Sequence, residues 1–176
     1  MKVVISSGHG KYIRGAHGLL DEVDEARRVV EAVADRMRSR TDSIVVTYHD
    51  DVSTTQNENL KCIVDFHNSQ LPHDLDVSVH FNAYVETDDP RGTEVLFVTQ
   101  RMLAEKMSWE ISEAGGFIDR GEKYRPDVFF LNNTVEPAIL IEVCFVDSQA
   151  DADLYNEKFD AICDAIADVL SKAKVA

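Results

Sequence analysis

Cysteine is scarce in this sequence of 176 residues, and the three cysteines are not paired by spacing. Cys62, Cys144 and Cys163 are odd in number, far apart and without any C-x-x-C pattern. A disulfide framework usually has an even number of cysteines, and a cysteine zinc site usually has closely spaced pairs. The sequence therefore indicates neither. We therefore interpret the three cysteines as reduced packing residues.

Positive charge is also scarce: 18 lysines and arginines face 32 aspartates and glutamates, which gives a formal net charge of -14. A chain with this charge has no field that gathers phosphates, which argues against nucleic acid and anionic membrane surfaces as partners. No apolar run approaches the roughly 20 residues of a membrane-spanning helix, so we expect no membrane insertion. Residues 1–8 are too short in their apolar part for a secretory signal, so we expect cytoplasmic synthesis without a signal peptide.

What remains is the composition of an ordinary globular domain, with 44% apolar and 28% charged residues, 8 glycines and 4 prolines. The length suits one hydrophobic core rather than two. No repeat, linker or low-complexity tract is visible. We therefore expect residues 1–176 to form a single domain, to act as a monomer and to carry no appended module.

Short β-branched or alternating segments take turns with longer segments of helical periodicity along the whole chain. The pattern predicts strands at 2–6, 44–48, 75–81, 92–99 and 137–141, helices at 21–37, 55–68, 102–114 and around 154–170, and a short extended piece at 128–131. Such alternation predicts an α/β fold: a mostly parallel, twisted sheet with helices on both faces. In these sheets, functional sites gather at the carboxyl ends of the strands.

Several residues able to do chemistry lie at predicted strand ends or at the first helix start. His9 follows a glycine turn after the first strand, His80 lies on the polar face of a strand near its end, and Glu142 follows the apolar run 137–141. Glu22 and Glu25 open the first helix. Two imidazoles and one carboxylate are a common ligand set of catalytic zinc, and a further carboxylate can move the proton of a water.

Each of these residues also has an ordinary interpretation. A histidine after a glycine turn or on a strand's polar face is often only hydrogen-bonded, as His9 and His80 could be. Glu22 and Glu25 lie where carboxylates complement the helix dipole. Glu142 differs, because an ionised carboxylate at the end of an apolar strand is costly to desolvate unless a site compensates it.

A cysteine nucleophile is a minor alternative. Strand alternation would place Cys144 on the same face as Glu142, where it could pair with His80. Packing is the simpler interpretation of this cysteine. The remaining histidines are weaker candidates: His17 could line a groove, His67 follows a helical face, and His49 and His73 lie in loops.

Seven short segments carry a family resemblance that spans nearly the whole chain. They are Ser7-Gly8-His9-Gly10, Gly15-Ala16, Asp21-Glu22-Val23, the segment 77–83, the segment 92–95, Arg120-Gly121 and the segment 137–147. In this order they resemble the zinc-dependent N-acetylmuramoyl-L-alanine amidases of the Amidase_3 type. The likeness is greatest to catalytic domains of phage and prophage endolysins, which share the stretch 53–57 as well.

The resemblance implies roles for individual residues. His9, Glu22 and His80 match the ligands of one Zn²⁺ ion, and Glu142 matches the general acid and base. The resemblance, not the spacing, favours Glu22 over Glu25 as the second ligand. Asn82 and Glu94 match polar positions that we interpret as supporting or groove residues.

The implied activity is hydrolysis of peptidoglycan by zinc-activated water, at the amide between N-acetylmuramic acid and L-alanine of the stem peptide. The implied setting is phage lysis of the cell wall after a holin-type release, without a wall-binding domain in this chain. Residues 11–14 and Tyr48-His49 depart from the family pattern, which leaves the preferred stem peptide open. A charge of -14 is also a poor match for a wall that carries anionic polymers.

Three other functions stay open at this point. A zinc peptidase or carboxypeptidase could cut another peptide with the same residues. A catalytically silent module could bind the wall without cutting it. A cysteine hydrolase could act through Cys144.

Overall fold

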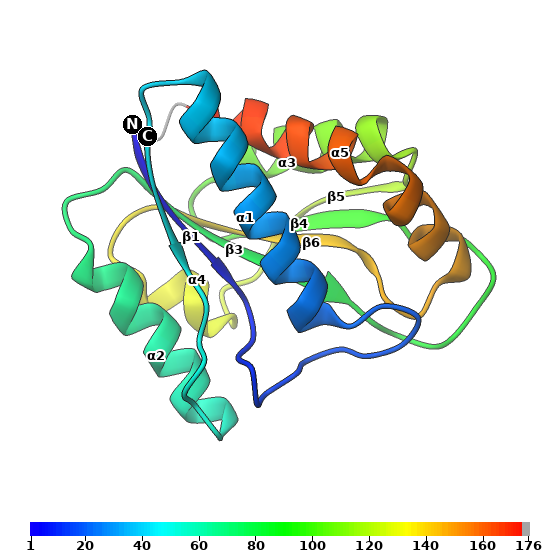
Figure 1. The fold of residues 1–176 in the computed structure, drawn as a ribbon, viewed down its shortest axis with the longest axis horizontal. Coiled ribbons are helices and arrows are strands. Elements are labelled where there is room, and N and C mark those ends of the chain that lie inside the picture. The colour runs from blue at the N-terminus through cyan, green and yellow to red at the C-terminus, as the bar shows by residue number, and fades with distance from the viewer. Residues whose placement is uncertain (174–176) are drawn as a thin grey trace.

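Six strands form one sheet in the order β2-β1-β3-β6-β4-β5 (Figure 1). The computed structural model describes residues 1–173. Strands β1, β2, β3 and β6 run parallel, β4 pairs antiparallel with β6, and β5 runs parallel to β4. The strands are β1 (Lys2–Ser7), β2 (Ile44–Tyr48), β3 (Leu75–Asn82), β4 (Thr93–Phe97), β5 (Asp119–Tyr124) and β6 (Ala138–Phe145). The predicted single α/β domain with a mostly parallel sheet is confirmed.

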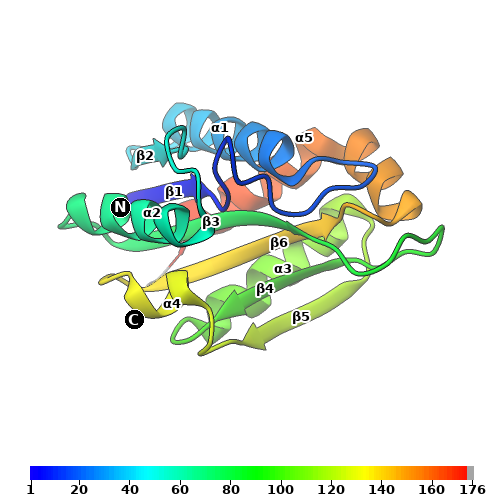
Figure 2. The ribbon, with the colours of Figure 1, turned by 90° about the horizontal axis from the view of Figure 1, so that it is seen from below.

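Helices cover both faces of this sheet, as predicted (Figure 2). One face packs into the larger core with α1 (Glu22–Arg40), α3 (Arg101–Gly115) and α5 (Gln149–Ser171). The other face packs into a smaller core with α2 (Gln56–Ser69) and α4 (Phe129–Asn133). Over residues 1–173, none of these helices combines the length and apolar character needed to cross a bilayer.

Side chains of the central strands alternate between these two cores. Val77 and Val79 of β3 lie in the larger core, so Ser78 and His80 between and after them point to the smaller one. On β6, Leu140 belongs to the smaller core, which puts Glu142 on the same face. The polar residues of these two neighbouring strands therefore share the face that α2 and α4 cover only in part.

Local capping sets where α1 and α2 begin. The side chain of Asp21 accepts hydrogen bonds from the backbone N–H groups of Val23 and Asp24, so α1 begins at Glu22. At the start of α2, Thr55 and Glu58 form a reciprocal capping box. The caps are local sequence features, which is why the starts of α1 and α2 were predictable to within a residue. Helix α5 begins at Gln149, five residues before the predicted start.

Two parts of the predicted element order are wrong. The segment 128–131 is not extended, because residues 129–133 form the short helix α4. Side chains of Asn132 and Asn133 donate to preceding carbonyls of this turn, while Phe130 and Leu131 bury against α2. A four-residue apolar run does not distinguish a strand from a helical turn. Strand β5 was missed because its sequence is polar and it lies exposed at the sheet edge.

A bulge between β3 and β6 corrects the predicted position of Cys144. His80 pairs with Glu142, but Asn82 pairs with Phe145, so β6 carries one extra residue here. The extra residue shifts the alternation, and Cys144 lies in the larger core instead of beside Glu142. The strand also continues to Phe145, so Glu142 lies within β6 and not at its end.

Candidate metal centre

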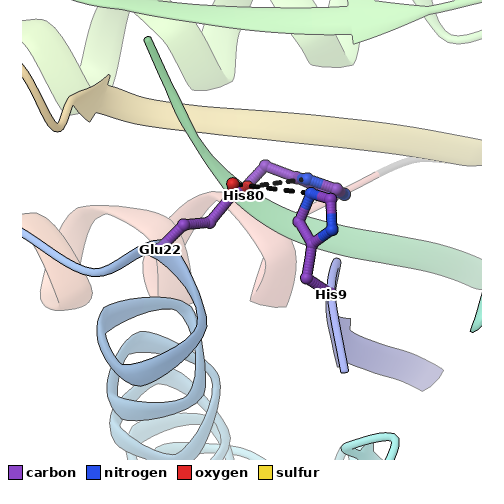
Figure 3. A group of neighbouring side chains, drawn as sticks. All are labelled: His9, Glu22 and His80. Atoms are coloured by element: carbon purple, nitrogen blue, oxygen red, sulfur yellow. Dashed lines mark hydrogen bonds and ion pairs between the residues drawn. The ribbon is translucent and has the colours of Figure 1, made fainter. Parts of the chain in front are cut away.

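Three side chains from distant parts of the sequence meet at the carboxyl end of β1 and β3 (Figure 3). His9, Glu22 and His80 each offer one donor atom, and these atoms all lie within 4.8 Å of one another. Nδ1 of His80 is 3.0 Å from Oε1 of Glu22, and Nε2 of His9 is 3.4 Å from Oε2 of the same carboxylate. The structure thus brings together the three residues that the sequence analysis singled out as metal ligands.

Two glycines make room for these side chains. A Cβ atom on Gly8 would lie 1.9 Å from the ring of His80. A Cβ atom on Gly15, whose φ is +69°, would lie 2.3 Å from Oε2 of Glu22 and 2.5 Å from the ring of His9. Only glycine fits at both places, because any other residue would push the donor groups apart.

Backbone donors hold the carboxylate of Glu22 in place. Its Oε2 accepts from the N–H of Ala16 at 2.6 Å, and its Oε1 accepts from the N–H of Phe81 at 3.1 Å. Burial alone would raise the pKa of Glu22, but the hydrogen bond and charge of His80, together with these donors, outweigh burial and lower it. Glu22 is therefore an ionised carboxylate with a fixed orientation.

The two histidines are shifted in opposite directions. Burial and the nearby His80 lower the pKa of His9 to about 4, so His9 is neutral at neutral pH. Burial is the largest single effect on His80 and lowers its pKa, but the hydrogen bond with Glu22 and the negative charges of Glu22 and Glu142 together outweigh burial and raise the pKa. Within residues 1–173, Nδ1 of His9 is buried without a hydrogen-bond partner. A neutral imidazole is a suitable metal ligand through Nε2, the nitrogen that lies beside Glu22.

Glu142 lies beside His80 in the sheet, on the same face. Its Oε2 is buried and accepts no hydrogen bond from any residue that the structure describes. Burial raises the pKa of Glu142 to about 7, and the negative charges of Glu22 and Glu94 contribute, although His80 acts against them. A carboxyl group with such a pKa can take up and release a proton near neutral pH.

These residues fit a zinc ion. Two imidazoles and a carboxylate are the donor set of many catalytic zinc sites, which keep a further position open. The glycine cradle, the neutral imidazole of His9 and the ionised carboxylate of Glu22 all suit a cation at this place. The adjoining acid, Glu142, completes the arrangement expected for hydrolysis.

A small apolar cavity of about 70 Å³ opens beside the two histidines. Its deeper walls come from α2, α4 and β6, through Leu60, Ile63, Phe130 and Leu140. The hydroxyl of Ser78 lines it and is buried without a partner in the described part of the chain. The sequence analysis missed this residue, although a serine between Val77 and Val79 in a buried strand was a signal.

Other polar residues that the sequence analysis considered lie around the centre or away from it. Asn82 donates to Glu94 at 3.1 Å, and Glu94 in turn accepts from Arg120 at 2.7 Å, which makes them neighbours of Glu142. Glu25 turns away from the centre, since it accepts from the hydroxyl of Tyr155 at 2.7 Å. The geometry therefore favours Glu22 over Glu25 as the third donor.

The remaining histidines and Cys144 lie outside the centre. His67 and His73 both contact Asp76, His49 contacts Ser7 and Glu31, and His17 is exposed near Asp21. Cys144 is fully buried, and burial raises the pKa of its thiol well above the ordinary value. A buried thiol in the opposite core cannot act as a nucleophile with His80.

Known proteins resemble this chain over most of its length. A family model described as Amidase_3, N-acetylmuramoyl-L-alanine amidase, matches residues 3–172. An uncharacterized 38.4 kDa protein of Clostridium perfringens is 34% identical over 163 residues, which are 90% of this chain and 47% of that protein. Uncharacterized protein CPE1502 of Clostridium perfringens (strain 13 / Type A) is 28% identical over 99% of this chain and 53% of its own length. The chain thus spans about half the length of the curated relatives it matches.

Solved structures share the fold over nearly the entire chain. The catalytic domain of the CD27L endolysin targeting Clostridia Difficile has a TM-score of 0.84 and 24% identity, covering 100% of this chain and 99% of that chain. The catalytic domain of CwlV, an N-acetylmuramoyl-L-alanine amidase from Bacillus (Paenibacillus) polymyxa var. colistinus, has a TM-score of 0.79 and 25% identity, covering 98% and 97%.

Proposed function

Since the chain belongs to the Amidase_3 family of N-acetylmuramoyl-L-alanine amidases, we propose that it cuts peptidoglycan between N-acetylmuramic acid and L-alanine of the stem peptide. The observation that carries this proposal is the meeting of His9, Glu22 and His80 beside a buried acid. Such a centre suits hydrolysis of an unactivated amide, which needs an activated water and a proton donor for the leaving amine.

His9, Glu22 and His80 are the residues that would hold one Zn²⁺ ion. When bound, the ion supplies Lewis-acid chemistry, which polarises the amide carbonyl and makes water a better nucleophile near neutral pH. Glu22 keeps its orientation through the N–H groups of Ala16 and Phe81, so the donor set is arranged before substrate arrives.

Glu142 would carry the proton. Its buried carboxylate accepts a proton from the attacking water and then delivers it to the nitrogen of L-alanine as the amide bond breaks. The pKa of about 7 supports both steps, because neither form of the carboxyl group is strongly favoured near neutral pH. The products are a muramoyl carboxylate and a stem peptide with a free amino terminus.

Digestion of purified sacculi tests this proposal. The purified chain should bind one zinc per molecule by metal analysis, and mass spectrometry should find stem peptides that begin with free L-alanine. A chelator should stop the release, and zinc should restore it where magnesium does not, because imidazole ligands suit zinc better.

Other outcomes of the same digestion would contradict parts of the proposal. Release of stem peptide by the chelated protein would refute the role of the metal. Cuts at another peptide bond would favour a zinc peptidase or carboxypeptidase. Sedimentation with sacculi without any peptide release would favour a catalytically silent wall-binding module.

The resemblance of the sequence to endolysins supports a wider role in phage lysis. In that role the domain acts as a monomer on the wall, after a holin-type partner has opened the membrane. Expression in a susceptible host tests this, because lysis should then require the holin as well as Glu142.

A further inference from the structure

A second cleft, of about 290 Å³, lies at the end of β3, the strand that carries His80. Asn82, two residues beyond His80 on β3, forms one wall of it. Its other lining residues are Ala83, Tyr84, Arg91, Arg120 and Phe145. We call this hollow the arginine cleft. It contains two cationic side chains in a protein whose net charge is -14.

Arg91 has an unusual position among the ten arginines of the chain. The other nine each lie within ion-pair distance of a carboxylate, whereas Arg91 has no such partner among residues 1–173. Its Nε is buried and, over the same residues, makes no hydrogen bond. A partly desolvated guanidinium without an acceptor is costly, so an anionic ligand would be favourable there.

The backbone around Arg91 is held firmly. The N–H groups of Arg91 and Gly92 donate to the buried carboxylate of Asp151, at 3.0 and 2.9 Å. The guanidinium lies 5.0 Å from the centre of the Tyr84 ring, which supports its planar group from one side. Arg91 is therefore presented to the cleft by a fixed loop.

Arg120 provides the second cation. Its Nε donates to Glu94 at 2.7 Å, and its Nη1 lies 3.5 Å from the carbonyl oxygen of Arg91. These contacts use Nε and Nη1 of the guanidinium, and they bring its terminal group to the backbone of Arg91. Two guanidiniums on one cleft match the paired oxygens of a carboxylate.

We propose that Arg91 and Arg120 bind a carboxylate of the stem peptide, close to the bond that is cut. This inference rests on the proposed function, because it names the part of that substrate which the arginine cleft recognises. The carboxylate nearest to the scissile amide belongs to the second stem residue, a γ-linked D-glutamate. Peptidoglycan carries this group either free or amidated, so the cleft selects the free acid.

Two disaccharide muropeptides that differ only in this group test the inference. The free acid should be cleaved with a kcat/KM about 10- to 100-fold higher than the amide, because one charge-assisted contact is lost with the amide. Arg91→Gln should remove most of this preference, because KM should rise far more for the acid than for the amide. Arg91→Lys should keep part of it.

Arg101→Gln is the matched control. It removes one arginine from the exposed pair with Glu122, so it changes the net charge equally at a place away from the cleft. The control should keep the full preference for the free acid. Loss of this preference in Arg101→Gln would mean that the overall charge of the protein, and not the arginine cleft, causes the preference for the free acid. That result would overturn the inference.

Failure of the inference and failure of the proposed function are distinguishable. Equal cleavage of both muropeptides, or a preference that survives in Arg91→Gln, overturns the inference and leaves the amidase activity intact. Cleavage of neither muropeptide overturns the proposed function. In that case calorimetric titration of L-alanyl-γ-D-glutamate into the protein still decides on the cleft, since binding should weaken about tenfold in Arg91→Gln, and unchanged binding overturns the inference.

Discussion

The metal centre and a second polar group, which we call the inner cluster, use the same residue types on the same face of the sheet. The inner cluster consists of Ser6, His67, His73 and Asp76. Nδ1 of His67 and Nε2 of His73 each lie 2.6 Å from Oδ1 of Asp76, and Nε2 of His67 lies 2.9 Å from the hydroxyl of Ser6. Like the centre, this group combines two histidines with one carboxylate.

Access separates the two groups. The side chains of His67, His73 and Asp76 are 0% exposed, whereas those of His9 and His80 are 17% and 15% exposed and line a cavity. Unpartnered atoms do not separate them, since Nδ1 of His73 and Oδ2 of Asp76 also lack partners within the described residues. The donors of the metal centre are therefore within reach of a substrate, whereas the buried inner cluster can contribute only to stability.

Glu142→Gln should give the largest effect. The amide cannot accept the proton of water, so kcat should fall about 10²- to 10⁴-fold. The fold should stay intact, because a buried ionisable group is replaced by a neutral one of the same shape. Muropeptide release and thermal unfolding, measured side by side, check this. A variant that unfolds as its activity disappears would mean that Glu142 is structural.

Asp76→Ala should have the opposite profile. Removal of the carboxylate leaves two buried histidines without their acceptor, which should lower the free energy of unfolding by about 3 kcal/mol or more. Urea denaturation measures this loss, with Asp42→Ala on the exposed loop after α1 as a neutral control. The fraction that folds should still cleave muropeptides. Stability equal to that of the control would remove the distinction between the two groups.

Zinc should stabilise the protein through the centre alone. A free zinc concentration 100 times the dissociation constant should add about 2.7 kcal/mol to the free energy of unfolding and raise Tm. His9→Gln should abolish this gain in stability. His73→Gln should lower the stability measured without zinc but keep the gain that zinc adds. Differential scanning calorimetry with and without zinc gives both values. An increment that depends on His73 would place the ion in the inner cluster.

The smallest expected effect concerns pH. Burial lowers the pKa of His67, which faces Asp76 and His73, so folded protein keeps it neutral where the unfolded chain is protonated. Below about pH 6.5 the unfolded state binds the extra proton, so the free energy of unfolding falls as pH falls, by at most about 1.4 kcal/mol per pH unit from this group.

Chelated wild type and His67→Gln, unfolded in urea between pH 7.5 and 5.5, should differ in this slope. The variant should lose less stability on acidification. The share of this loss that comes from His9, whose pKa is lowered to about 4, should remain in the variant. Parallel slopes for the two proteins would show that His67 is protonated in the folded state.

Much of the molecule could be predicted from local signals. The strand and helix alternation, the cap at Asp21 and the capping box at Thr55 are properties of short segments, and α1 and α2 begin where these signals predict them. His9, Glu22 and His80, which the family resemblance selected, also lie together in the structure. Strand β5 and helix α4 were not predicted. Pairing with β4 and packing in the smaller core determine their conformation, and their own sequences carry no clear periodicity.

The sequence by itself determined the kinds of elements, the caps that begin the helices, and which side of β3 carries Ser78 and His80. Only the tertiary structure decided that Cys144 lies in the larger core and that Asp76 is buried with two histidines. It also decided that Arg91 lies at a cleft without a carboxylate partner among residues 1–173. Alternation along a strand depends on the residues of that strand. The burial of a side chain, its access to solvent and its contact partners depend on which distant segments pack over the strand. No short stretch of sequence contains that information.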